Sequence, residues 1–488
     1  MKKNQTLNYS LFFLVISASL LLLTKYFESG DKYLAFFDDD FYYYIQTIKQ
    51  TFKSGFITFN GIVVTNGFHP LWFWLLTILS VILGFGKGLF IVVNIITISL
   101  SAVVFSESHK LLTDKFQLEE YYSLASSLFV SFIYLLIGKG GMEVIITIPL
   151  IIYLLNLLTK DESVSSFKIG LVYSLCFLSR LDSIILLILL TIYIIKFRKG
   201  FNFTKFLIGL IPSAFYLLSN LFFYHTLMPI SGMAKQLKNS YWPVTNTIES
   251  LISFNPNHII YSLIPIFCIF ISIILLMNKR IMSRIKVLSI ISILFPLVLI
   301  LFNSIVSGWG FWPWYYYIFI PSQLMFFILF APYIRGNKKT LWVMIVIFIL
   351  CWSFGFGIFK KGIHYDNYNG AKGIQEFSID KKGVYAMGDR AGLVSFLIEN
   401  PLIQMEGLVM NKQFVHDLKS NKLLKLLNMY DVNYYIANNP NRINNSKWFV
   451  QDPYKIHPSQ IVSSDTIYSV PYDSVIVKTW KYYIFKMK

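Results

Sequence analysis

The chain has 488 residues, of which 55% are hydrophobic, 18% aromatic and 14% charged, and its mean hydropathy is +0.58. Soluble domains carry about 25% charged residues, so this composition excludes a soluble protein and predicts an integral membrane protein with many spans. The net charge of +18 would suit a nucleic-acid partner. However, the basic residues cluster between apolar segments, at 196–205, 279–286 and 335–339, which is typical of cytoplasmic loops. We therefore expect membrane lipids, and no nucleic acid, as partners.

The apolar segments predict the spans. The first, 11–23, follows Lys2 and Lys3, and no small-residue cleavage site comes after it. We therefore predict an uncleaved helix whose N-terminus lies in the cytoplasm. Since a span needs about 20 residues and several later segments are shorter, we expect about 10 to 11 transmembrane helices in a cell inner (plasma) membrane. The later segments are 71–85, 89–105, 122–137, 144–158, 169–195, 206–224, 259–277, 287–306, 315–333 and 341–359.

The sequence changes character after residue 359, because charged residues become frequent and no apolar run reaches spanning length. With the basic loops inside, this part falls on the outer face. We predict an all-α polytopic membrane domain over 1–359 and a small extracytoplasmic α/β domain over 360–488. Residue patterns in the second domain predict strands at 384–387, 434–436, 474–478 and 482–485, and one helix at 418–429.

The first outer loop, 28–68, holds three consecutive carboxylates, Asp38, Asp39 and Asp40. Acidic side chains grouped at a membrane boundary are costly to place and suggest a functional site. A solvated loop whose aspartates end a helix is the alternative. We expect no cofactor and no metal, although three adjacent carboxylates would allow a divalent cation to bind through oxygen. The segment 42–52 has a helical pattern that suits a helix along the membrane surface.

His69 lies beside Pro70 just after the first outer loop. A histidine there is more often a turn residue than a ligand, and with no second His or Cys nearby we expect no zinc site.

Polar residues interrupt the apolar pattern at four other places, near the outer boundary or inside apolar runs. These four polar stretches are 140–143, 179–182, 227–235 and the aromatic cluster 309–317.

Each polar stretch has a purely structural explanation. Glu143 could cap a helix start, and Arg180 and Asp182 could neutralise each other. Lys235 could be an ordinary loop lysine, and the aromatic cluster an interfacial belt. Taken together, the stretches instead indicate chemistry on a polar head group held at the outer leaflet.

The residue types suit transfer chemistry on a lipid phosphate. Carboxylates can take a proton from an attacking hydroxyl, and partial burial raises their pKa into a useful range. Arg180 and Lys235 offer cations for a phosphate. Aromatic rings such as Trp314 and Tyr315 suit the apolar faces of a sugar or an isoprenoid chain. A lipid-phosphate leaving group is stable as an anion, so it needs a cationic cradle more than a general acid.

At these residues the sequence resembles the GT-C superfamily of polytopic glycosyltransferases, which use polyprenyl-phosphate-linked sugars. The likeness is to bacterial members with the patterns DDAFYY, TNGFHPLW, GMET, RLDS and PISG followed by a lysine. The corresponding stretches here are DDDFYY at 38–43, TNGFHPLW at 65–72, GMEV at 141–144, RLDS at 180–183 and PISG at 229–232 with Lys235. A later match, from DRAG at 389–392 through EGL at 406–408, resembles the family's outer domain.

The resemblance implies a GT-C-like fold and an inverting sugar transfer, from a polyprenyl-phosphate donor to a glycan, lipid or protein acceptor, at the outer membrane face. It implies that Asp38 or Asp39 acts as the base. Two positions depart from the family pattern, because Asp40 replaces an alanine and Val144 a threonine. The residues expected to bind the substrates are Asn66, His69, Glu143, Arg180, Asp182, Lys235, Trp314 and Tyr315.

The resemblance also exposes a problem of topology. It places Gly140 outside, whereas simple alternation of spans from an outer Asp38 places Gly140 inside. One of the short early segments is therefore expected to be tilted, re-entrant or broken, and the polar stretch 180–182 inside a long apolar run is one candidate.

Two other functions fit part of the pattern. A lipid-glycan flippase or transporter would explain the spans and the intramembrane charges, but not the outer domain or the acidic loop, and we find no internal repeat. A glycan polymerase or ligase shares most of the transfer chemistry and differs in its donor.

Overall fold

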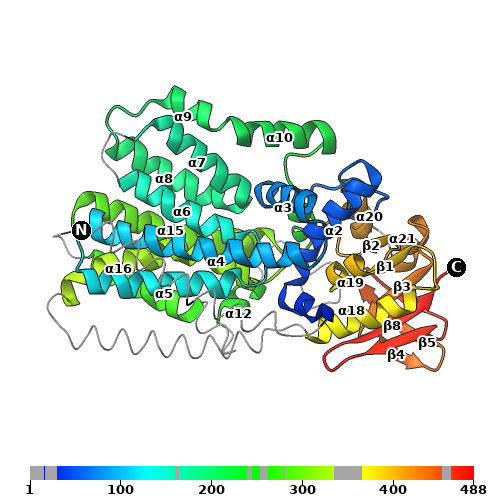
Figure 1. The fold of residues 1–488 in the computed structure, drawn as a ribbon. Coiled ribbons are helices and arrows are strands. Elements are labelled where there is room, and N and C mark those ends of the chain that lie inside the picture. Colours follow the sequence, from blue (N-terminus) through cyan, green and yellow to red (C-terminus); the bar gives the residue numbers. More distant parts are fainter. Residues whose placement is uncertain are drawn as a thin grey trace.

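A computed structural model describes Ile16 and residues 30–159, 164–238, 245–252, 262–277, 281–334, 365–420, 422–452 and 463–488 (Figure 1). A bundle of long helices fills one part of the molecule. A smaller α/β unit, built from residues after 364, sits at one end of that bundle (Figure 1).

The bundle has the lengths and apolar surfaces that a bilayer requires. Within the described ranges, four helices are long and apolar enough to cross a membrane, or five if α9 and α10, which are bent by 51°, form one span. Phe215 and Phe222 on α10 are 72% and 75% exposed, as suits side chains that face lipid. The helices of this part include α2 (Asp39–Ser54), α3 (Pro70–Leu83), α4 (Lys87–Lys110), α5 (Glu120–Gly138), α6 (Val144–Thr159), α7 (Ser166–Ser179), α8 (Ile184–Phe197), α9 (Phe203–Gly209), α10 (Ile211–Tyr224), α11 (Ile230–Lys235), α14 (Ile264–Leu276), α15 (Ser283–Val306) and α16 (Ile320–Ile334).

The chain is therefore a membrane protein with several apolar helices, as its composition predicted. The predicted span 341–359 lies outside the described residues, and so does 11–23 apart from Ile16. The long apolar segment 169–195 is not one helix, because α7 ends at Ser179 and α8 begins at Ile184. Between them Arg180 is extended, with φ of −152°, and a short 3-10 turn, η3 (Leu181–Ser183), follows it.

The short helix α3 accounts for the problem of topology. Trp72, in its first turn, donates a hydrogen bond to the carbonyl oxygen of Gly141 (3.0 Å). Phe85, just past its end, packs against Phe52 of α2 with 6.2 Å between ring centroids. Helices α2 and α3 lie at the end of the bundle that carries the C-terminal unit (Figure 1). Helix α3 therefore begins and ends near that end without crossing, and Gly140 lies on the same side as the first loop.

The C-terminal unit is built on two sheets. In the larger sheet the strand order is β2-β1-β3-β8-β7, with β1 parallel to β2 and β3 and with β8 antiparallel to both β3 and β7. The smaller sheet has the antiparallel order β4-β5-β6. The strands are β1 (Tyr385–Met387), β2 (Leu402–Gln404), β3 (Tyr434–Asn438), β4 (Asn441–Asn444), β5 (Lys447–Asp452), β6 (Ser463–Ile467), β7 (Asp473–Ile476) and β8 (Lys481–Lys486), and the helices are α18 (Tyr365–Ser378), α19 (Ala391–Leu397), α20 (Lys412–Ser420) and α21 (Leu423–Met429).

All four predicted strands are present, as β1, β3, β7 and β8. The single helix predicted over 418–429 is wrong, because α20 ends at Ser420 and α21 starts at Leu423. Strands β2, β4, β5 and β6 were not predicted. In the larger sheet, β1 lies between β2 and β3, to both of which it is parallel. Helix α19 follows β1 in the chain.

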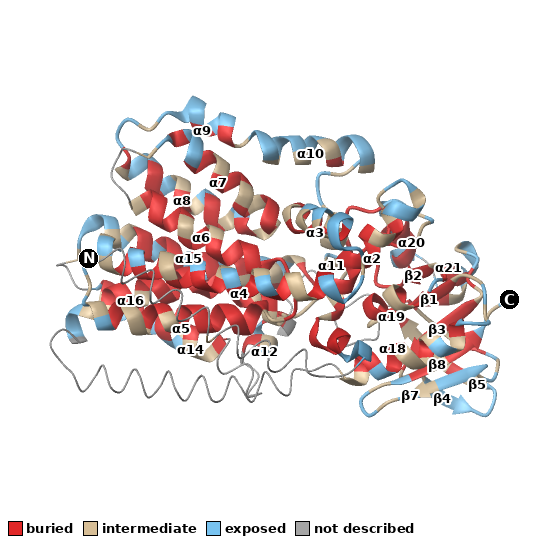
Figure 2. Ribbon diagram, viewed as in Figure 1, coloured by how far each residue is buried: buried red, intermediate tan, exposed pale blue. Residues whose placement is uncertain are grey.

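Helix α2 joins the two parts of the molecule. It begins at Asp39, three residues earlier than the sequence pattern suggested, and it lies between the bundle and the C-terminal unit (Figures 1 and 2). Even its polar residues Gln46 and Thr47 are buried. The expected helix along the membrane surface is therefore a largely buried helix, packed on α3 and on α19.

Candidate active site

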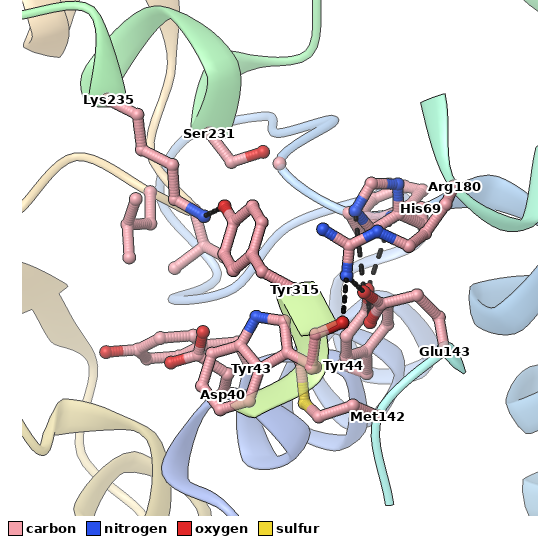
Figure 3. Close-up of a pocket in the computed structure, with 15 residues that line it drawn as sticks. Asp40, Tyr43, Tyr44, His69, Met142, Glu143, Arg180, Ser231, Lys235 and Tyr315 are labelled. Carbon is pink, nitrogen blue, oxygen red and sulfur yellow. Dashed lines mark hydrogen bonds and ion pairs between the residues drawn. The ribbon is translucent and has the colours of Figure 1, made fainter. Parts of the chain in front are cut away.

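A small cavity of about 50 Å³ lies where α2 meets the ends of several bundle helices (Figure 3). Its walls come from parts of the chain that are far apart in sequence: the first turns of α2, the loop before α3, the start of α6, the α7–α8 break, α11 and the 3-10 helix η5 (Pro313–Phe319). The lining residues are Asp40, Tyr43, Tyr44, Gly67, Phe68, His69, Met142, Glu143, Arg180, Ser231, Lys235, Trp314, Tyr315, Leu408 and Val409.

One side of the cavity is built around Arg180, whose side chain is only 2% exposed. Its Nε and Nη2 donate to the two carboxylate oxygens of Asp182, each at 2.9 Å, in a bidentate pair. Its Nη1 donates to Glu143 Oε1 at 2.8 Å. The guanidinium also lies over the rings of Tyr315 and Tyr317, 4.6 and 4.7 Å from their centroids. Two carboxylates thus compensate one buried cation, which is the condition for a buried charge to be tolerated.

Further hydrogen bonds hold Glu143 in place. The Tyr44 hydroxyl donates to Glu143 Oε2 (3.0 Å), and His69 Nε2 lies 3.7 Å from Oε1. The Nδ1 of His69 accepts the backbone N–H of Leu181 (3.4 Å). Burial lowers the pKa of His69, so the imidazole is neutral at pH 7 and carries its proton on Nε2, towards Glu143. We call Arg180, Glu143, His69 and Asp182 the Arg180 cluster.

Lys235 and Asp40 lie across the cavity from this cluster (Figure 3). The Lys235 ammonium donates to the Tyr315 hydroxyl at 3.0 Å, which is a bond to a neutral group. Burial alone would lower the pKa of Lys235, but Tyr315 and Asp40 shift it upward, and the net pKa is above its ordinary value. The lysine therefore stays charged, with its amine at the cavity.

Asp40 is the aspartate that reaches the cavity. It stands in the first turn of α2, and Tyr43 and Tyr44, three and four residues later, share its face of the helix. Burial raises the pKa of Asp40 to about 7, with contributions from the neighbouring carboxylates, while Lys235 partly offsets that rise. The Asp40 carboxyl therefore titrates at a much higher pH than an exposed aspartate.

The other two aspartates point elsewhere. The Asp39 carboxylate accepts the backbone N–H groups of Gly392 (2.8 Å) and Leu393 (2.9 Å) in the C-terminal unit. Asp38 lies against the 140 region: its backbone N–H donates to the carbonyl oxygen of Gly140 (3.1 Å), and a Cβ on Gly140 would meet its carboxylate. Because the three carboxylates diverge, they do not form the shared cation site that the sequence allowed. Nowhere in the described ranges do three metal-ligating side chains converge.

Six of the eight residues expected to bind substrate line the cavity, namely His69, Glu143, Arg180, Lys235, Trp314 and Tyr315. The other two support them. Asp182 holds Arg180, and Asn66 fixes the helix that carries Lys235: its Oδ1 accepts the backbone N–H of Ile230 (3.0 Å) and its Nδ2 donates to Asn220 Oδ1 (3.2 Å).

Some cavity residues were not anticipated. Tyr43 and Tyr44 would have followed from a helix that starts at Asp39, because the spacing then places them beside Asp40. Leu408 and Val409 come from the C-terminal unit, and nothing in the sequence shows that their loop packs here. The remaining unanticipated residues of the lining are Gly67, Phe68, Met142 and Ser231.

Comparisons with known proteins agree with this architecture. No family model matches the sequence, and no curated protein matches it. Among solved structures, the apo Archaeoglobus fulgidus oligosaccharyltransferase is similar with a TM-score of 0.56 and 10% identity, over 90% of this chain and 70% of that one. ArnT from Cupriavidus metallidurans, bound to undecaprenyl phosphate, has a TM-score of 0.56 and 12% identity, over 88% of this chain and 93% of that one. The oligosaccharyltransferase AglB from A. fulgidus, with an inhibitory peptide and a dolichol-phosphate, has a TM-score of 0.54 and 11% identity, over 89% and 69%.

These structures belong to GT-C superfamily glycosyltransferases. The chain therefore has the GT-C fold, with a C-terminal unit that contains strands, and the resemblance indicated by the motifs is confirmed at the level of the fold.

Proposed function

We propose that this membrane protein transfers a sugar from a polyprenyl-phosphate donor to an acceptor hydroxyl at the cavity, with Asp40 as the general base. The GT-C fold supports the class of reaction, and the neighbours solved with undecaprenyl phosphate or a dolichol-phosphate support the class of donor. One observation carries the proposal: a carboxylate with a pKa of about 7 and a lysine ammonium, whose hydrogen bond among the described residues goes to a neutral hydroxyl, line one cavity.

We choose Asp40 as the base over Asp38 and Asp39, which the sequence indicated. The pattern that the chain resembles has an alanine at this position, so Asp40 would be a base particular to this chain. A general base must lie within hydrogen-bond reach of the proton it removes. The Asp39 carboxylate is engaged by two backbone amides, and Asp38 lies against Gly140. Asp40 alone of the three lines the cavity.

In the transfer step, the acceptor oxygen attacks the anomeric carbon of the sugar. The bond from that carbon to the phosphate oxygen breaks, and its electron pair leaves with polyprenyl phosphate. The acceptor proton passes to the ionised carboxylate of Asp40. Attack opposite the leaving group inverts the anomeric centre. Lys235 offsets the negative charge that develops on the departing phosphate.

The charges of the cavity favour a monophosphate donor. Glu143 and Asp182 carry two negative charges against the one positive charge of Arg180, so Lys235 supplies the positive charge that faces the ligand. Because negative charge is already in excess around the cavity, a sugar phosphodiester with one negative charge fits it better than a diphosphate with two. This distinguishes the transfer that we propose from a polymerase or ligase that uses diphosphate-linked glycans.

We assign the remaining expected residues to orientation. Arg180 directs its guanidinium edge to the cavity, held by Glu143 and Asp182, and His69 supports Glu143. Asn66 fixes the helix that carries Lys235. Trp314 and Tyr315 offer ring faces to the sugar.

The cavity would open at the extracytoplasmic face of the inner membrane, with the N-terminus in the cytoplasm. The membrane domain would end near residue 359 and the C-terminal unit, from 360 onward, would lie outside. The acceptor would be a glycan, a lipid or a protein. No step of the proposal passes through a metal.

A deletion strain tests the proposed function and at the same time identifies the sugar. Mass spectrometry of its surface glycans and glycolipids is expected to show one missing sugar, which the wild-type gene restores. Asp40→Asn is expected to restore less than about 1% of it, because a general base contributes about 100-fold or more. Asp473→Asn, at an exposed strand position, serves as the matched control. An unchanged glycan profile in the deletion strain would refute sugar transfer, and full restoration by Asp40→Asn would refute the assigned base.

A further inference from the structure

The residue beside the proposed base is held by the C-terminal unit. Asp39 is 6% exposed, and its Oδ2 and Oδ1 accept the N–H groups of Gly392 (2.8 Å) and Leu393 (2.9 Å). Asn367 Nδ2 adds a third donor, 3.3 Å from Oδ1. A carboxylate that accepts this many hydrogen bonds is fixed in direction. Its peptide link to Asp40 transmits that restraint to the first turn of α2.

The close approach of α19 to α2 depends on a glycine. A Cβ at Gly392 would lie 2.2 Å from the backbone oxygen of Asp39 and 2.8 Å from its Oδ2, so a side chain there forces the two elements apart. Further along the same pair of helices, Lys49 Nζ donates to the carbonyl oxygen of Phe396 (3.0 Å). The contact is therefore built over more than one turn of α2.

The same unit also forms part of the cavity wall. Leu408 and Val409 line the cavity, and a Cβ on Gly67 would lie 1.9 Å from the backbone oxygen of Leu408. The C-terminal unit thus touches the site in two ways: directly through this loop, and through Asp39.

We propose that Asp39 is a positioning residue, through which the C-terminal unit holds the first turn of α2 and keeps the Asp40 carboxylate directed into the cavity. This inference rests on the proposed role of Asp40. It assigns to the C-terminal unit a part in the chemical step, in addition to any part in binding an acceptor. A base displaced by about 1 Å costs roughly 100-fold in rate, so the restraint affects kcat more than KM.

The test uses full-length protein in lipid nanodiscs. The donor is the undecaprenyl-phosphate-linked form of the sugar that is missing in the deletion strain. The variants Asp39→Asn and Gly392→Ala both disrupt the contact between α2 and α19, the first from α2 and the second from α19. Asp473→Asn and Gly86→Ala are the matched controls, because Asp473 is exposed and a Cβ at Gly86 would meet nothing within 4 Å.

Both contact variants are expected to lower kcat by about 10- to 100-fold with KM within about threefold of wild type. Hydrogen exchange at residues 392 and 393 should speed up in both. Only Asp39→Asn should also move the acidic limb of the pH profile to lower pH, because it removes a negative charge that raises the pKa of Asp40. A role in folding alone would not produce that shift.

A milder pair of variants serves if these proteins fold poorly. Lys49→Met removes the second contact and is expected to lower kcat about threefold, whereas Lys53→Met, at an exposed position on the same helix, should leave it unchanged.

Two results would overturn the proposal. One is faster hydrogen exchange at residues 392 and 393 in the contact variants with kcat unchanged. The other is wild-type hydrogen exchange at these residues in those variants. If Asp40→Asn abolishes transfer while Asp39→Asn behaves as wild type, the inference fails and the proposed function stands. If Asp40→Asn is active, the proposed function itself fails.

Discussion

The two sides of the cavity carry the same kinds of side chain but compensate their charges differently. In the Arg180 cluster two carboxylates bond one buried guanidinium, and further hydrogen bonds from Tyr44 and to His69 fix the cluster. Across the cavity, Lys235 is bonded to a phenol and Asp40 has a pKa of about 7. The first side has the properties of a fixed scaffold, and the second has charges left for a substrate. The following variants test that division.

Breaking the scaffold should have the largest effect. Glu143→Gln leaves the buried Arg180 with its bidentate partner Asp182 but weakens its charged hydrogen bond to position 143, and such a bond contributes about 1.5 to 3 kcal/mol of stability. We expect a marked fall in the melting temperature of the detergent-solubilised protein and loss of transfer with it. Glu376→Gln, at an exposed position, is the control. A Glu143→Gln protein with wild-type stability would show that the Arg180 cluster is not a scaffold.

Lys235→Met should separate activity from stability. The substitution removes a charged hydrogen-bond donor to the phosphate, a loss of about 1.5 to 3 kcal/mol, or roughly 10- to 100-fold in kcat/KM. The melting temperature should hardly change, because the lysine bonds only a neutral hydroxyl. Lys419→Met, on the exposed face of α20, is the comparison. A large loss of stability in Lys235→Met would place Lys235 in the scaffold instead.

Tyr44→Phe probes the link between the two sides, since its hydroxyl donates to Glu143 while its helix carries Asp40. Loss of this bond should cost about 1 kcal/mol of stability and lower transfer by roughly fivefold. Tyr121→Phe, at a 71% exposed position, is its control. Equal behaviour of the two variants would exclude a contribution of the bond.

Removal of divalent cations should have the smallest effect. The three aspartates diverge, and Lys235 already supplies positive charge at the cavity. We expect EDTA to change the rate of donor turnover by less than about twofold. A loss of turnover that Mg²⁺ or Mn²⁺ restores would contradict this expectation.

Much of the fold was readable from local patterns. Apolar runs located the helices, and the polar stretch at Arg180 marked a break, because a buried charge cannot continue an apolar span without a partner. Short strands such as β2, with three buried residues, gave no alternation to detect. The re-entry of α3 depends on packing against α2, which no local pattern contains.

The site was readable in part. The polar stretches and the aromatic cluster named six of the cavity side chains, because cations, carboxylates and rings stand out within apolar runs. Which of Asp38, Asp39 and Asp40 reaches the cavity was not readable, because it depends on where α2 begins. One residue along a helix turns a side chain by about 100°, and the partner that engages Asp39 lies more than 350 residues away.

The most direct test of the central claim is the pH dependence of kcat/KM for the wild-type protein, which reports the pKa of the free enzyme's base. With Asp40 as the base, kcat/KM should be constant above its pKa of about 7 and fall tenfold per pH unit below it, because only the ionised carboxylate accepts the proton. A profile that is flat between about pH 5.5 and 8.5 would contradict the account, since no group with a raised pKa would then control the reaction.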